Sequence, residues 1–160
     1  MRLALFCCAF MLSAASLAAS LAAESKVYLV ATVTLGGSNL SSSIFLYEPE
    51  ITDLQSCTQA AQQGQQRGDW LRYHHILRRD KMKGFTAQTS YRCVNAEQDI
   101  ETWYDKDRYD YAYLVSIDAE AKLQVKPAVD LSACHALLNK LSAAQQAQSF
   151  CAKGNQRIGQ

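Results

Sequence analysis

The sequence predicts an α+β protein: an antiparallel sheet of five to seven strands with two helices on one face, held by disulfide bonds. Three observations support this class. Segments rich in β-branched and aromatic residues recur along the chain. Two helical segments each follow a capping aspartate. Four cysteines lie downstream of an export signal, which is the context in which disulfides form.

Residues 1–23 have the three parts of a secretory signal peptide. Arg2 supplies the positive start, an apolar run follows, and small residues lead to a cut after Ala22 or Ala23. A retained membrane anchor is the alternative, because about 21 residues carry no charge and could span a bilayer. Alanine and serine insert weakly, however, and no positive cluster follows. We therefore expect a signal peptide over 1–23, one α+β domain over 24–160, and no membrane span after cleavage.

The first half of the mature chain predicts a hairpin, a helix and a returning strand. A Gly-Gly-Ser-Asn turn separates the two hairpin strands, and Asp53 is the expected N-cap of the helix. The expected elements are strands at 26–35 and 42–48, a helix at 54–66, a strand or irregular basic segment at 70–79, and a strand at 86–95.

The second half repeats this order. Asp130 is the expected cap of an amphipathic helix whose leucines recur at helical spacing. The expected elements are strands at 110–117 and 121–126, the latter ended by Pro127, a helix at 131–144, and a short strand through Phe150 and Cys151.

Short matches support a degenerate two-fold repeat of hairpin–helix–strand units. Tyr28-Leu29-Val30 matches Tyr113-Leu114-Val115, and each hairpin is followed by proline and then Asp-Leu-x-x-Cys. The helix starts are Asp53 to Cys57 and Asp130 to Cys134, with one residue inserted in the first stretch.

The repeat predicts how the cysteines pair. Cys7 and Cys8 leave with the signal, so four remain and allow three connectivities. If each helix is linked to the strand that follows it, the pairs are Cys57–Cys93 and Cys134–Cys151. The second bond requires the chain to leave its helix before Phe150, because a continuous helix would hold these cysteines about 25 Å apart.

Charge argues against nucleic acid as a partner. The chain has 16 basic and 15 acidic residues, and removal of Arg2 leaves 15 of each. A balanced chain has no overall field to attract a polyanion. The balance nevertheless hides two segments of opposite sign. Residues 67–92 carry seven cations against two acids, and residues 97–110 carry six acids against two cations.

These segments also hold most of the aromatic residues, which gives two interpretations. They are solvated stretches that pair with each other, or they form a surface that binds an acidic protein or an anionic polymer. Tyr109, Tyr111 and Tyr113 alternate as one face of a strand would. The binding interpretation rests on these candidate residues: Arg72, Arg78, Arg79, Lys81, Trp103, Tyr104 and Tyr109.

No motif predicts catalysis, a metal or a cofactor. His74 and His75 would point to opposite faces of a strand, and His135 has no suitably spaced carboxylate to complete a site. The chain is therefore expected to be a non-catalytic binding protein of the cell envelope or exterior, periplasmic or secreted. The alternative is a small hydrolase of envelope polymers. Its candidate acids are Glu97, Asp99, Glu101, Asp105 and Asp107.

Overall fold

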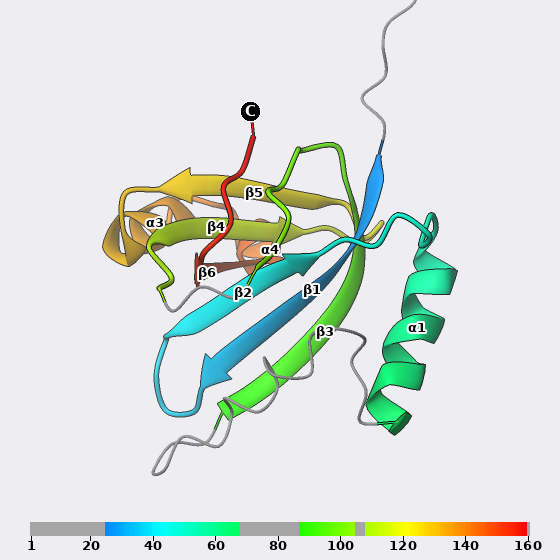
Figure 1. The fold of residues 1–160 in the computed structure, drawn as a ribbon. Helices are drawn as coiled ribbons and strands as arrows, with labels where there is room; N and C mark the ends of the chain where they lie inside the picture. The colour runs from blue at the N-terminus through cyan, green and yellow to red at the C-terminus, as the bar shows by residue number, and fades with distance from the viewer. Residues whose placement is uncertain (1–24, 68–86, 105–107, 160) are drawn as a thin grey trace, which may run out of the picture.

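The computed structural model describes residues 25–67, 87–104 and 108–159, which fold around one six-stranded sheet (Figure 1). The predicted α+β class is confirmed. The segment 70–79, which was expected to be a strand or irregular, lies outside the described residues. The elements are β1 Lys26–Leu35, β2 Ser41–Leu46, α1 Leu54–Arg67, β3 Ala87–Ala96, β4 Tyr111–Ile117, β5 Leu123–Ala128, α3 Leu131–Leu138, α4 Ala143–Ala147 and β6 Ser149–Gly154.

Both predicted helix starts are real, and both are capped in the same way. The Asp53 carboxylate accepts the backbone N–H of Ser56 at 2.8 Å, and the Asp130 carboxylate accepts that of Ala133 at 2.7 Å. Each aspartate therefore satisfies one of the N–H groups that a helix start leaves without an internal partner.

The helix expected over 131–144 is two helices, α3 and α4, with a break between them. Ser142 starts the second helix through a capping box with Gln145, in which each side chain bonds the other's backbone N–H. The chain then leaves α4 after Ala147 and enters β6, so the condition for the Cys134–Cys151 bond is met.

The strand order reproduces the predicted repeat. The sheet runs β3-β1-β2-β6-β4-β5, so each half places its third strand beside its first and its first beside its second. Within each half all pairs are antiparallel. The halves join where β2 runs parallel to β6 at Ser42 and Lys153, which makes the sheet mixed. Pro127 was expected to end its strand, but β5 continues through it to Ala128. Proline has no backbone N–H to donate, and this is tolerated in β5 because the strand is the last in the sheet order.

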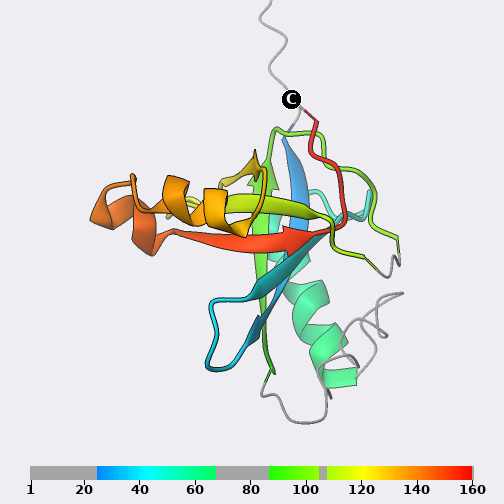
Figure 2. The same ribbon diagram turned by 90° about the vertical axis from the view of Figure 1, so that its left-hand side faces the viewer.

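The sheet curls until its two outer strands touch. Asn95 at the end of β3 forms a parallel bridge with Lys122, just before β5, and its N–H donates to the Ala121 carbonyl at 2.8 Å. Strands of the second half run crosswise to those of the first (Figure 2). The inner face of this barrel-like sheet is the main core, to which all six strands contribute buried side chains, among them Tyr28, Phe45, Val94, Tyr113, Val125 and Ala152.

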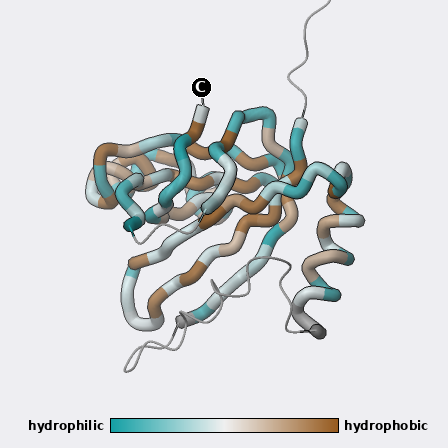
Figure 3. Tube along the Cα trace, viewed as in Figure 1, coloured by the Kyte–Doolittle hydropathy of each residue, from teal (hydrophilic) through white to brown (hydrophobic). Residues whose placement is uncertain are grey.

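Both main helices lie on the outer face of the sheet, where α1 covers β1 and β3, and α3 covers β4 and β6. The apolar residues concentrate on the strands, while α1 carries a polar outer side (Figure 3). Two smaller outer clusters result. One contains Ala31, Ile44 and Leu46 with aromatic residues above them, and the other contains Leu114 with the leucines of α3.

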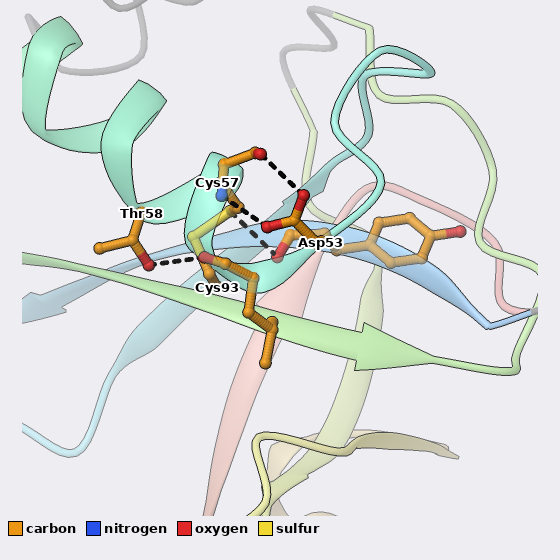
Figure 4. The surroundings of a disulfide bond; sticks show 7 residues. Asp53, Cys57, Thr58 and Cys93 are labelled. Carbon is orange, nitrogen blue, oxygen red and sulfur yellow. Dashed lines mark hydrogen bonds between the residues drawn. A yellow bond between two sulfur atoms is a disulfide. The ribbon is translucent and has the colours of Figure 1, made fainter.

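The predicted disulfides, Cys57–Cys93 and Cys134–Cys151, are both formed. In each half a cysteine in the first turn of the helix is joined to the third strand. Figure 4 shows the bond of the first half, Cys57–Cys93. Leu29 lies opposite Cys93 and Leu114 lies opposite Cys151 in the sheet register, so the two bonds occupy matching places. Two internal disulfides are consistent with an exported protein, and none of the described helices is long and apolar enough to cross a membrane.

Two glutamines close the barrel where the halves meet. Gln98 lies just after β3. Its side chain accepts a hydrogen bond from the Val125 N–H at 2.6 Å and donates one to the Val125 carbonyl at 2.9 Å. The Gln156 side chain follows β6 and does the same to Phe45, at 2.7 and 2.8 Å. Beyond them the tails cross at an Ile100–Ile158 bridge, which seals this end of the barrel.

Tyr113 gives the fold an alkaline limit that can be measured. Its hydroxyl is buried and donates to the Gln156 carbonyl, and burial raises the pKa of Tyr113 well above its usual range. The unfolded chain therefore ionises first, so this stabilisation is complete below about pH 10 and is lost as pH rises further. We expect the melting temperature to fall above about pH 10, and to fall less steeply in Tyr113→Phe. Parallel curves for the two proteins would contradict this assignment. Some of the slope should survive in the variant, because burial also raises the pKa of Tyr28.

Candidate functional site

The predicted binding residues separate into two groups. Arg72, Arg78, Arg79 and Lys81 lie outside the described residues, as do His74 and His75. Trp103, Tyr104 and Tyr109 are described, and they lie in the segment that connects the two halves. The structural account of the site therefore rests on this connecting segment and what surrounds it.

Trp103 and Tyr109 pack against the outer face of β1 and β2. They join Leu29 and Tyr91 around the buried Ala31, Ile44 and Leu46. These two aromatic side chains thus cover apolar sheet surface and anchor the connecting segment. The third side chain, Tyr104, points elsewhere and is 52% exposed.

Tyr104 is held by the second half of the chain. Its backbone carbonyl accepts a hydrogen bond from the Asn155 side-chain amide at 3.2 Å. Asn155 itself is buried and follows directly after β6. The exposed ring therefore extends from backbone that is fixed on both sides, by Trp103 packing and by this bond.

A cation that the sequence did not single out, Arg157, lies two residues after Asn155. Arg157 donates from Nε to the Tyr111 hydroxyl at 3.1 Å, and its backbone N–H donates to a Glu101 carboxylate oxygen at 2.8 Å. The Tyr111 hydroxyl, then the charges of Tyr111 and Glu101, raise the pKa of Arg157, with Tyr104 a smaller contributor. We call Tyr104, Tyr111 and Arg157 the Tyr104 surface.

The tyrosine stripe is divided by this arrangement. Tyr111 and Tyr113 lie on β4 with ring centroids 6.2 Å apart and stack on the inner face, whereas Tyr109 precedes the strand and packs outside it. Lys153 of β6 reaches the backbone carbonyl of Asp110 at 3.4 Å. Lys153 follows the inward-facing Ala152 and so points to the outer face of the sheet, whereas Arg157 bonds the inward-facing Tyr111.

The described acidic residues of 97–110 are mostly engaged in structural contacts. Glu97 pairs with Lys122 at 2.8 Å, and Asp99 pairs with Lys26 at 3.0 Å. These bonds raise the pKa of each lysine. Glu101 accepts from the Arg157 backbone, while Asp105 and Asp107 lie outside the described residues. Across residues 25–67, 87–104 and 108–159, no cluster of His, Cys, Asp and Glu could hold a metal ion.

A groove lies between α3, α4 and the outer face of β4 and β5. This groove has a volume of about 460 Å³. Leu114, Leu137 and Leu141 are among its apolar lining residues, and Lys122, Lys126 and Lys140 among its polar ones.

A sequence signal for the missed residues does exist. Cys93-Val-Asn-Ala-Glu-Gln98-Asp-Ile100 and Cys151-Ala-Lys-Gly-Asn-Gln156-Arg-Ile158 share the pattern Cys-x₄-Gln-x-Ile. This pattern aligns Gln98 with Gln156, the two glutamines that bond the backbone of the other half and that we call the clasp glutamines. It also identifies the tail that carries Arg157. No family model, curated protein or solved structure matches the chain.

Proposed function

We propose that this chain is an exported, non-catalytic binding protein of the cell envelope or exterior, and that it contacts its partner through the Tyr104 surface. The observation that carries the proposal is the half-exposed Tyr104 ring, whose backbone is bonded to Asn155 two residues before the exposed Arg157. The partner we expect is an acidic protein or an anionic polymer, because the exposed Arg157 guanidinium can bond to a carboxylate or a phosphate.

Two physical arguments favour binding at this place. Tyrosine and arginine are enriched among the residues that contribute most to protein interfaces, because they combine apolar area with directed hydrogen bonds. Ordering a loop on association costs free energy. Here Trp103 packing and the Asn155 bond already hold the segment, so much of that cost is avoided.

The hydrolase alternative receives less support from the described residues. A glycoside hydrolase needs one protonated and one ionised carboxyl group facing each other. Glu97 and Asp99 instead pair with two separate lysines, Lys122 and Lys26. We therefore prefer binding to catalysis.

Export is part of the same proposal. Residues 1–23 have the composition of a signal peptide, and cleavage would deliver the domain to the periplasm or the exterior. There its four cysteines could form the two disulfides without opposition from a reducing cytosol.

Site-specific photo-crosslinking tests the binding surface. A benzophenone amino acid at position 104 should give a discrete adduct with an envelope component in the cells that produce the protein. Val129 is the matched control, because it is also a large apolar residue, 94% exposed, but belongs to the β5–α3 connection. Adducts at neither position, or the same adducts at both, would contradict the proposal.

A further inference from the structure

The barrel is sealed at one end and open at the other. The crossed tails close the end where β1 begins and β3 finishes. At the opposite end, between the β1–β2 hairpin and the second half, lies a cavity of about 280 Å³ that we call the barrel mouth. It is lined by Val30, Thr32, Thr34, Ser41, Ser90, Arg92, Ile117 and Phe150. Barrel mouths are common ligand sites, and this volume limits the occupant to one small molecule.

Hydroxyl groups form one wall of the barrel mouth in paired rows. Thr32 Oγ1 lies 2.8 Å from Ser43 Oγ, and Thr34 Oγ1 lies 3.0 Å from Ser41 Oγ. Each pair has two hydroxyl protons and uses one in the bond between its members, so one proton per pair is free for an outside acceptor. Ser90 extends the first row, because it lies opposite Thr32 in the sheet register.

Arg92 gives the barrel mouth its charge. It precedes the fully buried Val94 by two residues on β3, so both side chains point to the inner face of the sheet. Among the residues that the structure describes, Arg92 has no ion-pair partner, and none of the residues lining the cavity is acidic. A guanidinium carries five N–H donors in a planar fork that matches a carboxylate.

The remaining wall is apolar. Val30, Ile117 and Phe150 line it, and the latter two come from the second half of the chain. A ligand that fits the barrel mouth must therefore offer an anionic group, several hydroxyl or ether oxygens, and an apolar face. A sugar acid has all three, since the C–H bonds of its ring form a surface that packs on an aromatic side chain.

We propose that the barrel mouth binds a single sugar-acid unit, a hexuronate. Its carboxylate bonds to Arg92, its hydroxyls bond to Thr32, Thr34 and Ser41, and its ring lies against Phe150. The site is separate from the Tyr104 surface, because it uses the hairpin end of the barrel. The proposal for the barrel mouth can therefore be tested independently of the partner proposed for the Tyr104 surface.

An NMR titration of the oxidised mature chain tests this site. Sodium glucuronate should shift the amide signals of Thr32, Ser90 and Arg92 in a saturable way. It should bind at least about tenfold more tightly than glucose, which lacks the carboxylate, because a charge-assisted hydrogen bond contributes more than about 1.4 kcal/mol. It should also bind more tightly than acetate, which has a carboxylate but neither the ring nor the hydroxyls. A uronate tetramer separates the two sources of the ligand. Tighter binding than the monomer indicates a polymer end, and equal binding indicates a free sugar acid.

Variants assign the effect to Arg92. Arg92→Gln should remove the preference for glucuronate over glucose, whereas Arg92→Lys should retain part of it. Lys126→Gln is the matched control, because it removes the same charge from an exposed lysine in the other groove. The proposal is overturned if glucose binds as well as glucuronate, or if the shifts map to Lys126 and Lys140. Absence of saturation up to about 50 mM glucuronate would overturn it equally.

Discussion

Replacing Gln156 by methionine is expected to lower the free energy of unfolding by about 3–4 kcal/mol, because two buried backbone groups and one partly buried group lose their partner at once. The Gln156 side chain bonds the N–H and C=O of Phe45 and also donates to the Glu101 carbonyl at 2.7 Å. It is 2% exposed, so water cannot replace these bonds without opening the barrel. Methionine keeps nearly the same volume, which separates hydrogen bonding from packing. Urea denaturation of the oxidised mature protein measures the loss.

Gln98→Met is the matched control for this prediction. Gln98 makes the equivalent pair of bonds to Val125, but it is only half-buried and makes no third bond among the described residues. Its replacement should therefore cost about 1–2 kcal/mol, because solvent can reach the groups left behind. Equal and small losses at both positions would show that the glutamine clasps do not hold the halves together.

Removal of the Cys57–Cys93 bond should cost about 4 kcal/mol, and removal of Cys134–Cys151 about 3 kcal/mol. The difference follows from loop length in the unfolded chain, since the bonds join residues 36 and 17 apart in sequence. Paired Cys→Ala variants, which leave no free thiol, isolate each bond. The decrease in melting temperature should be larger for the variant that lacks Cys57–Cys93 than for the variant that lacks Cys134–Cys151.

The chain-entropy argument for this ranking can fail in a defined way. Cys134 is fully buried and its sulfur lies 3.2 Å from the Tyr113 carbonyl oxygen, within a cluster of leucines. If removal of Cys134–Cys151 proves more damaging than removal of Cys57–Cys93, packing around the sulfur outweighs loop length.

Local signals were sufficient to predict most of the described elements and both disulfides. Asp53 and Asp130 predict helix starts because their carboxylates accept hydrogen bonds from backbone N–H groups three residues later in the sequence. The Asp-Leu-x-x-Cys repeat predicted the cysteine pairing because each bond joins a helix to the strand that follows it. Even the break between α3 and α4 had a signal, in the Ser142-x-x-Gln145 capping box, although the alanines and glutamines around it favour a continuous helix.

What the sequence could not supply was the relation between the halves. The parallel β2–β6 pairing and the Asn95–Lys122 bridge join residues far apart in the chain, and no local propensity encodes them. The Tyr104 surface depends on that relation, because it combines residues 104 and 111 with Arg157. Trp103 and Tyr109 were predicted to bind a partner, but the same relation places them against the sheet, where they anchor the segment.

The central claim is that the Tyr104 surface contributes to binding and not to stability. One double variant tests this claim through two measurements, the melting temperature and the affinity for the partner. In Tyr104→Ala/Arg157→Gln the melting temperature should stay within about 4 °C of the parent, because both side chains are exposed. Binding of the partner crosslinked at position 104 should fall at least about tenfold. Unchanged binding, or a loss of binding that merely follows unfolding, would contradict the account.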